Sequence, residues 1–460
     1  MSNNQRGSQV ALDARAERDA RIPEAFRLTP EFIAKYPPGA DVRAAAAESG
    51  LMSPEELNIT SLDQDAVSIL ARIKSKEITA LLCCLTDFFL DDALARAKEL
   101  DDFYAKTGKL VGPLHGLPIS IKDHIYLAGR KSTTGFCVDT LQPPATKNGF
   151  LPQILYDAGA EPTTSRVPKG GLCPEPGADS IDFTFGPISR SLRDIDLWFS
   201  IVLGCKPWLK ENSLVPIPWE VPTTPSLSGS NGRLRIGVMW HDDVVLPQPP
   251  IRRALKTLVD ALIKDPGLEL VEYKPFKHSE AVALAHELYF VDGGECAREK
   301  AAAGGESLLP LTEWVITLPS VKNHTVHELW EMNIRRDTLR AQYLEHYNAQ
   351  NVDVVLCPAG PGPAPPLGTS KYWGYTNVWN FVDYPAAVFP TGLHSDPALD
   401  VKDTAPRTYM GETDRLNSDS YDPEVFAGAP LCLQLVSRRF ADELVVRALE
   451  EISKALPLGR

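Results

Sequence analysis

The feature that most constrains the fold is an alternation of apolar runs and amphipathic stretches in the second half of the chain. RLRIGVMW (233–240) and LELVEYKPF (268–276) have the composition of strands, and PPIRRALKTLVDALIKDPG (249–267) between them has apolar residues at helical spacing. DVVLCPAGPG (353–362) predicts a buried strand that enters a loop, and residues 430–452 predict a strand followed by a helix. This order predicts a mostly parallel sheet with helices on both faces.

The first 230 residues carry a weaker pattern. Residues 1–22 are polar and are predicted to form a flexible tail. DQDAVSILARIKSK (63–76) and DDALARAKELDDFYAKTG (91–108) have apolar residues at helical spacing, and Gly108 is a typical helix stop. PTTPSLSGSNG (222–232) is rich in turn residues and marks either a domain boundary or, as we predict, a surface loop.

The totals argue against several classes of protein. The 460 residues carry a net charge of −13 and no basic patch, so nucleic acid is not an expected partner. The eight cysteines are scattered without a CxxC pair, which argues against a disulfide framework or a thiolate metal site. No apolar run reaches the roughly 18 residues of a membrane span, and no signal peptide is visible. We therefore expect a cytoplasmic protein.

One lysine stands out in GPLHGLPISIKD (112–123). Apolar residues at every second position from Leu117 to Ile121 predict a strand that ends on Lys122. Glycines frame both ends, so the strand is expected to open into a tight loop, which is where α/β sheets place their sites. Most lysines at a strand end are simply solvated. A lysine that loses hydration there has a lowered pKa and can take a proton from a serine hydroxyl.

The chain resembles the amidase signature enzymes, and within them the fungal acetamidase or general amidase branch. The resemblance covers most of the chain from about residue 50, and matching blocks occur in the family's order. The blocks are GLMSPEELNIT, DDALARAKELD, GPLHGLPISIKD with STTG behind it, ATKNGFLPQILYDAGA, FGPISRSLRD, RIGVMWHDDVVLPQPP, CPAGPGPAPP, KYWGYTNVWNFVDYPAAVFPTG and GAPLCLQLVSRRFADE.

The resemblance implies a fold, a reaction and a site. The fold is a single domain over residues 23–460, with α/β/α layers around a central mixed sheet. The reaction is hydrolysis of a small-molecule carboxamide to a carboxylic acid and ammonia or an amine, with no metal or organic cofactor. Lys122 falls on the family's catalytic lysine, which acts through a Ser–Ser–Lys chain.

The two serines of that chain are not found. In the family they lie in a block similar to GGSSGG, whose backbone N–H groups also stabilise the oxyanion. ILYDAGAEP (154–162) matches the family before this block and TTSRVPKGGL (163–172) matches it afterwards, so we predict a deletion near 162–163. By comparison with the family, roughly 70–80 residues are absent there, and a smaller gap lies near 78–84. We expect the sheet to lack inner strands as a result.

Other serines are weak replacements for the missing nucleophile. Ser165 and Ser180 follow the predicted junction, and Ser120 lies on the same strand face as Lys122. Ser228 and Ser230 lie in SGSNG, which precedes a strand and matches a linker of the family. We expect none of these five to be the nucleophile.

Some polar motifs have structural alternatives. HTVHE (324–328) places His324 and His327 near Glu328, but it is not an HExxH motif, and we predict a structural role on a helix. His115 is predicted to be a packing and turn residue. Asp123 either accepts a hydrogen bond beside the site or caps the next turn, and the sequence does not separate these alternatives.

The aromatic segment KYWGYTNVWNFVDYPAAVFPTG (371–392) also has two interpretations. It is either part of the core, the favoured alternative, or one wall of an acyl pocket in which Tyr372 and Trp373 contact the substrate.

Two functional hypotheses follow. In the first, the chain is an amidase-family hydrolase by descent that is inactive as written, with Lys122 as the surviving base. In the second, it is a catalytically dead relative that binds a ligand or partner, or the product of an incomplete gene model. The sequence leaves the amide and the oligomeric state open.

Overall fold

The computed structural model describes residues 3–20, 22, 24, 27–37, 44–59, 65–74, 90–117, 119–158, 178–182, 186–220 and 232–455. The sequence predicts one domain over 23–460, whereas the packing divides the chain into two compact units. Unit 1 comprises Met1–Gly177, Phe183–Trp219 and Cys296–Leu308, and unit 2 comprises Ala178–Asp182, Glu220–Glu295 and Leu309–Arg460.

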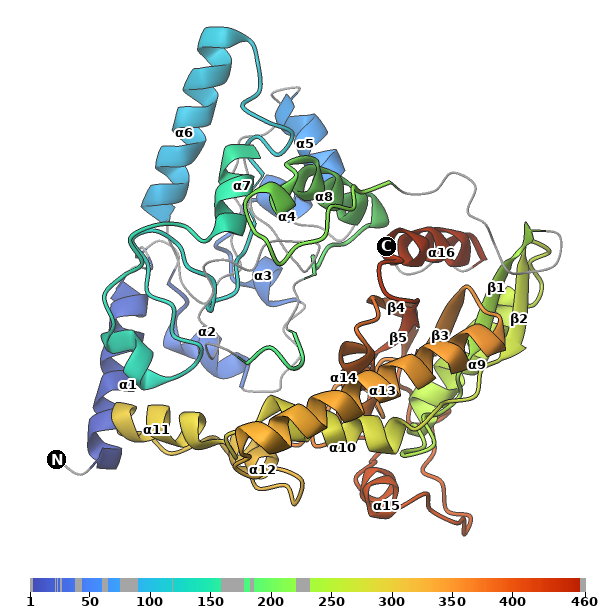
Figure 1. Cartoon of the computed structure of the whole chain (residues 1–460). Coiled ribbons are helices and arrows are strands. Elements are labelled where there is room, and N and C mark those ends of the chain that lie inside the picture. The colour runs from blue at the N-terminus through green and yellow to red at the C-terminus, as the bar shows by residue number, and fades with distance from the viewer. Residues whose placement is uncertain are drawn as a thin grey trace. The chain divides into compact units, whose positions relative to one another are not determined.

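The described part of unit 1 is helical (Figure 1). The predicted tail contains the helix α1 (Asn3–Ala20). The other helices are α2 (Pro30–Lys35), α3 (Ala45–Glu48), α4 (Pro54–Ile59), α5 (Ala66–Lys74), α6 (Leu90–Thr107), α7 (Phe150–Ala158), α8 (Leu192–Gly204) and most of α11 (Glu295–Gly304), with short 3₁₀ helices η2 (Cys137–Leu141) and η3 (Pro207–Leu209). The helices predicted at 63–76 and 91–108 are confirmed as α5 and α6.

The predicted stop of α6 is also confirmed. Gly108 has φ +65°, and its N–H donates to Tyr104 O at 2.8 Å. This left-handed turn satisfies a terminal carbonyl of the helix, and glycine adopts it without steric cost.

The beginnings of α5 and α8 are linked by one carboxylate. Asp194, in the first turn of α8, accepts hydrogen bonds from the N–H groups of Ala66 and Val67, each at 3.0 Å. Arg193 forms an ion pair with Asp65, which in turn accepts from Ser68 N. The first N–H groups of α5 therefore bind a buried acid from a helix 128 residues further along the chain.

Unit 2 is built on a five-stranded mixed sheet. Its strands are β1 (Leu234–Val238), β2 (Leu268–Glu272), β3 (Val354–Pro358), β4 (Ala386–His394) and β5 (Pro430–Val436), in the order β2-β1-β3-β5-β4. β1 is parallel to β2 and β3, whereas β5 is antiparallel to β3 and β4. The strands predicted at 233–240, 268–276, 353–362 and 430–436 are confirmed, but the last two strands of the order make the sheet mixed rather than mostly parallel.

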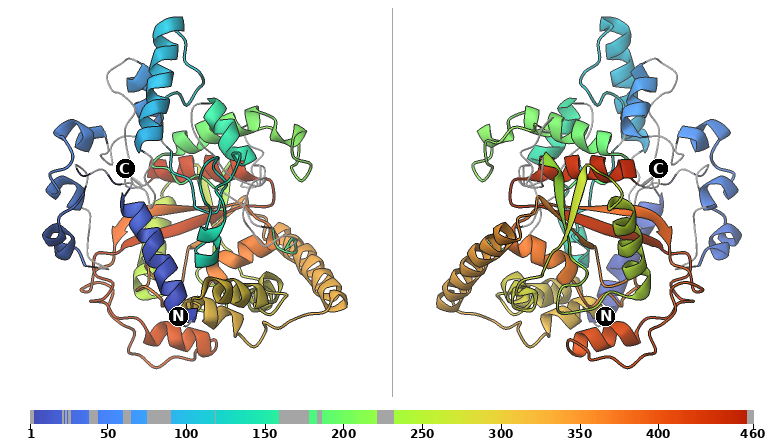
Figure 2. Two further views of the ribbon diagram at one scale, coloured as in Figure 1. Left: turned by 90° about the vertical axis from the view of Figure 1, so that its left-hand side faces the viewer. Right: turned by 90° about the vertical axis from the view of Figure 1, so that its right-hand side faces the viewer.

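Helices cover both faces of this sheet, as predicted. The helices of unit 2 are α9 (Pro249–Leu262), α10 (His278–Tyr289), α12 (Pro310–Ile316), α13 (Val326–Gln350), α14 (Gly374–Val382), α15 (Glu412–Asp419) and α16 (Asp442–Ala455). α9 and α16 contact the sheet, and Figure 2 shows α16 running along it. α10 and α13 lie side by side (Figure 1) and contact α14.

Alternate residues of β3 contribute to the core cluster that packs against α10, α13 and α14. Val355 and Cys357 belong to this cluster, so Val354 and Leu356 point to the opposite face. All four side chains are fully buried. β3 therefore has the continuous apolar sequence expected of a strand covered on both faces.

A buried histidine lies in the same cluster. His278 begins α10, and its Nε2 lies 2.9 Å from the Tyr343 hydroxyl. Burial, assisted by the charge of His346, lowers the pKa of His278 to about 3. In the unfolded chain the pKa is about 6.5, so between pH 6.5 and 3 only the unfolded state binds this proton. Stability therefore falls as the pH falls through this window.

We expect His278→Gln, which keeps a polar group near Tyr343, to remove this contribution. The difference in unfolding free energy between wild type and variant should change by about 1.4 kcal/mol per pH unit below pH 6.5, which urea unfolding at pH 7, 6 and 5 would measure. His394→Gln, at an exposed histidine, is the control and should leave the pH dependence unchanged. Parallel pH profiles for wild type and His278→Gln would contradict the assignment.

Candidate functional site

The segment predicted to present Lys122 is irregular rather than a strand. Leu117 and residues 119–122 lie outside any strand, and Pro118 lies outside the described residues. Leu117 and Ile119 pack against the helical core cluster of unit 1, which includes Leu155 and Trp198. The strand prediction is therefore wrong in this structure, because these apolar side chains are buried against helices and the described residues offer no neighbouring strand.

Lys122 itself is exposed in unit 1. No described residue forms a hydrogen bond or an ion pair with its ammonium group. The desolvation that the sequence argument assumed for this side chain is not observed. Within the described part of unit 1, Lys122 begins a turn, since its carbonyl accepts from Ile125 N at 3.1 Å.

Asp123 holds the two quoted blocks of this region together. Its Oδ2 accepts from the N–H of Thr133 at 3.1 Å and from the Thr133 hydroxyl at 2.5 Å. Ser132 adds a hydrogen bond from its hydroxyl to Ile125 O at 3.2 Å. Asp123 therefore fixes STTG next to the lysine loop.

His124 is a titratable neighbour of Lys122 that no motif in the sequence singles out. Burial, followed by the charge of Lys122, lowers its pKa, while Asp123 opposes the shift. Its place directly after Lys122 and Asp123 was the signal that could have drawn attention to it.

In unit 2 the expected position of a ligand-binding site is the edge of the sheet where β1 and β3 end. From β1 the chain passes through α9 to β2 on one side, and it later returns to β3 on the other side of β1. Open α/β sheets bind ligands at the carboxyl ends of parallel strands where the strand order reverses in this way, so this edge is the candidate position for a site. The loops concerned are 239–248 and 359–373.

Asp242 joins these two loops. Its Oδ1 accepts from Val244 N at 3.0 Å and Val245 N at 2.8 Å, and its Oδ2 accepts from the Tyr372 hydroxyl at 2.5 Å. The Tyr375 hydroxyl donates to Val245 O at 2.5 Å. Burial raises the pKa of Asp242, although these hydrogen bonds act against the shift. Nothing in the sequence pattern paired Asp242 with Tyr372, 130 residues away.

Tyr372 and Trp373 are both engaged inside unit 2. The Tyr372 hydroxyl is bound by Asp242, and burial raises its pKa. Trp373 Nε1 donates to Ser370 O at 3.2 Å, and its ring meets His286 and Trp314 edge to face. Within the segment 371–392 most residues of α14 are buried, whereas most residues of β4 are exposed or half-buried.

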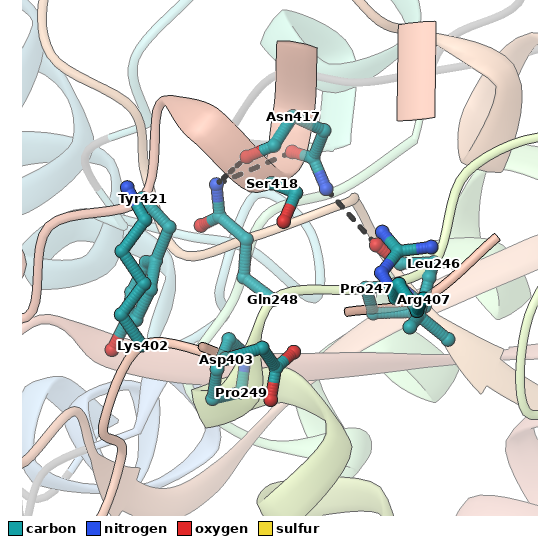
Figure 3. A pocket seen from close by; sticks show the side chains of 10 residues that line it. All are labelled: Leu246, Pro247, Gln248, Pro249, Lys402, Asp403, Arg407, Asn417, Ser418 and Tyr421. Carbon is teal, nitrogen blue, oxygen red and sulfur yellow. Dashed lines mark hydrogen bonds between the residues drawn. The ribbon is translucent and has the colours of Figure 1, made fainter. Parts of the chain in front are cut away.

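A small hollow adjoins the loop after β1 (Figure 3). It encloses about 250 Å³ including its open mouth, less than most ligand pockets. Its residues are Leu246, Pro247, Gln248, Pro249, Lys402, Asp403, Arg407, Asn417, Ser418 and Tyr421.

Gln248 anchors this hollow. Its Nε2 donates to both O and Oδ1 of Asn417 at 3.2 Å, and Asn417 Nδ2 donates to Leu246 O at 3.0 Å (Figure 3). A Cβ at Gly362 would lie 2.1 Å from Gln248 Oε1, so a larger residue there would force the Gln248 side chain to move. The amide is therefore fixed against the loop after β3.

Asp414 secures the other wall. Arg407 donates to both of its oxygens, at 2.7 and 2.8 Å, and the N–H of Leu246 donates at 3.0 Å. Burial alone would raise the pKa of Asp414, but the Arg407 hydrogen bonds hold it below its usual value. The hollow is thus a rigid polar feature of unit 2.

The serine candidates are dispersed. Ser120 is exposed, whereas Ser180 is buried in unit 2 and its carbonyl accepts from Arg336. Ser165, Ser228 and Ser230 lie outside the described residues, as do the predicted junctions near 162–163 and 78–84.

The histidine motifs have structural roles. Thr325 and Glu328 form a capping box at the start of α13, and His327 is exposed beside it. His115 is buried in a turn, where its Nδ1 accepts from Val111 N at 3.1 Å. The prediction for His115 is confirmed, whereas His324 precedes α13 rather than lying on it. The described residues contain no group of three side chains suited to a metal ion.

The predicted site residues fall into two sets. Lys122 and Asp123 belong to unit 1, and Tyr372 and Trp373 belong to unit 2. Each set is held by hydrogen bonds within its own unit.

Comparison with known sequences gives matches along nearly the whole chain. The sequence model of the Amidase family matches residues 68–161 and 157–446. A protein of Schizosaccharomyces pombe named as an amidase is 34% identical over 545 positions, covering 97% of this chain and 99% of the relative. An acetamidase of Emericella nidulans is 28% identical, covering 97% of this chain and 98% of its own.

Solved structures with a similar fold include a fatty acid amide hydrolase, with a TM-score of 0.87 and 24% identity over 99% of this chain and 95% of that one. A bacterial aryl acylamidase of the amidase signature family has a TM-score of 0.60 and 14% identity, covering 86% and 96%. At these identities the likeness supports the fold alone.

We expect Tyr372→Phe to destabilise unit 2 by about 1–3 kcal/mol, because it leaves the buried Asp242 carboxylate without one of its donors. Thermal and urea unfolding would measure the loss. Tyr409→Phe is the matched control, since the Tyr409 ring lies against Arg407 and its hydroxyl has no hydrogen bond within the described part of the chain. Equal stabilities of the two variants would show that the Asp242–Tyr372 bond contributes nothing.

Proposed function

Because this chain belongs to the amidase family, we propose that it derives from a carboxamide hydrolase, that Lys122 is the retained proton-transfer lysine, and that the chain as written does not complete the reaction. The observation that carries the proposal is the absence of a GGSSGG-like block anywhere in the 460 residues. Amide hydrolysis needs a nucleophile, a base and donors for the oxyanion, and that block would supply the first and the last.

The assignment of Lys122 rests on its place in GPLHGLPISIKD with STTG behind it. The hydrogen bonds from Thr133 to Asp123 hold these two blocks against each other in unit 1. A lysine beside a fixed turn suits a base that draws a proton from a neighbouring hydroxyl. The exposure of Lys122 is what we expect if the segment that would cover it is absent.

The comparisons support a deletion at the expected place. The two stretches matched by the family model meet at residues 157–161, next to the junction proposed at 162–163. The alignment with the S. pombe relative extends over 545 positions, although this chain has only 460 residues. Part of the relative therefore has no counterpart here.

The substrate class of the parent reaction is a small or medium carboxamide, cleaved to a carboxylic acid and ammonia or an amine. The acetamidase of E. nidulans is named for a substrate of this kind. No helix among the described residues is long and apolar enough to cross a membrane. We propose a cytoplasmic location.

The proposal predicts that a fluorophosphonate probe, which labels activated serines, does not label the purified chain. Acetamide hydrolysis should also stay at the uncatalysed rate, since loss of the nucleophile alone costs about 10⁶-fold. The acetamidase of E. nidulans serves as the positive control.

Two variants make this test decisive. Labelling of the wild type that is lost in Lys122→Ala and kept in Lys131→Ala, at another exposed lysine, would reveal a complete site and overturn the proposal. Sequencing the transcript across codons 160–165 separates the two origins of the gap. A coding block for adjacent serines there would indicate an incomplete gene model.

A further inference from the structure

One guanidinium on α13 has fewer partners than its position requires. Arg340 is half-buried, and its Nε donates to Phe381 O, in the last turn of α14, at 2.6 Å. Among the described residues no carboxylate pairs with Arg340, and nothing accepts a hydrogen bond from its two terminal nitrogens, Nη1 and Nη2. A cation that has lost part of its hydration is costly unless its N–H groups find acceptors. Neither nitrogen is fully enclosed, so a small molecule can reach both.

The carboxyl end of α14 explains only one of these N–H groups. Carbonyls at a helix end attract cations, and Arg340 Nε satisfies one of them. The carbonyls of Trp379 and Asn380 already accept from the N–H groups of Tyr384 and Asp383, at 2.9 and 3.1 Å. The terminal nitrogens of Arg340 therefore have no part in this cap.

Two neighbouring guanidiniums bind the carboxylates that act on Arg340. Arg336 lies one turn earlier on α13 and pairs with Asp337, with 2.8 Å between Nε and Oδ1. Arg439, in the loop after β5, pairs at 2.5 Å with Asp383, the residue that directly follows α14. Burial, followed by the charge of Arg336, lowers the pKa of Arg340, whereas Asp383 and Asp337 oppose the shift. The like charges therefore lie close enough to act on one another.

Arg438 adds a fourth guanidinium that has no carboxylate among the residues described. It donates to Asn348 Oδ1 at 3.0 Å and lies over the Tyr347 ring. Four positive charges against the two carboxylates named above leave a surplus of two. The name arginine cluster is used below for Arg336, Arg340, Arg438 and Arg439.

We propose that the arginine cluster binds a phosphate group, with Nη1 and Nη2 of Arg340 as its central donors. A planar guanidinium matches two oxygens of a phosphate at once. A phosphate group carries about 1.5–2 negative charges at neutral pH, close to the surplus of the cluster, whereas a carboxylate carries one. All four arginines belong to unit 2, and the site does not depend on the amide reaction.

Isothermal titration of the full chain with inorganic phosphate, at constant ionic strength in chloride buffer, tests the proposal. We expect saturable binding with a Kd of about 1 mM or lower. Acetate should bind about tenfold more weakly or worse, because it brings one charge and two oxygens. An absence of phosphate binding up to about 20 mM, or acetate binding of equal affinity, overturns the proposal.

Variants of the cluster connect the binding to Arg340. Arg340→Gln should weaken phosphate binding about tenfold or more, and Arg340→Lys, which keeps the charge without the planar fork, should recover only part of the affinity. Because Arg340 also caps α14, Arg439→Gln, at a 59% exposed side chain, is the second variant and should weaken binding about threefold. Arg415→Gln, paired on α15 with Glu412 and Asp419, is the control and should bind as the wild type does. Unchanged affinity in both cluster variants overturns the proposal.

A phosphate monoester separates the two sources of such a group. Methyl phosphate that binds as tightly as inorganic phosphate indicates a phosphorylated small molecule as the ligand, since the site then tolerates an attached carbon. Methyl phosphate that binds about tenfold more weakly indicates free phosphate. In either case binding should be lost in Arg340→Gln, and binding of the monoester that survives this substitution contradicts the assignment.

Discussion

The arrangement of unit 2 depends on the complete burial of β3. Its backbone pairs with β1 on one side and with β5 on the other, and its side chains are covered on both faces. A strand in this position leaves no polar group to water, so its ends must be satisfied by protein. Tyr347 and Ser437 both donate to Asp353 O, and Gln434 Nε2 donates to Pro358 O. The strand is held at both ends as well as along its length.

The burial of β3 also determines how the loops at the candidate-site edge of unit 2 are held. Gln434 also donates to Tyr375 O, which fixes the start of α14 to the end of β3. Tyr375 and Tyr372 then reach the loop after β1 through Val245 and Asp242. One set of buried hydrogen bonds therefore joins the two loops, and Tyr372, which the sequence suggests as a wall of an acyl pocket, is part of it.

Much of unit 2 could be predicted from local pattern, because its strands and helices each have one clear period. The sequence pattern does not predict β4, because Pro390 and Gly392 interrupt its alternation. Both residues are tolerated because β4 is an edge strand of the sheet. The segment 117–122, in contrast, was predicted to be a strand and is not one. Its alternation is that of a strand, but apolar residues alone do not provide a hydrogen-bonded neighbour, and the helical core buries Leu117 and Ile119 instead.

The candidate site was less predictable than the fold. The block GPLHGLPISIKD identified Lys122 and Asp123 as candidates. The hydrogen bond between Thr133 and Asp123 could not be predicted without knowing the path of the chain between these two residues. The Asp242–Tyr372 contact joins residues 130 positions apart, which no local pattern encodes.

The link from Asp194 to the start of α5 has a consequence for synthesis on the ribosome. Ala66 and Val67 emerge long before residue 194 is translated, and the 128 residues between Ala66 and Asp194 take roughly ten seconds to add. During that interval Asp65 can already accept from Ser68 N, but the N–H groups of Ala66 and Val67 lack the carboxylate of Asp194. The start of α5 can therefore reach its native pairing only after residue 194 has emerged, so its last two hydrogen bonds form well after the helix itself can form.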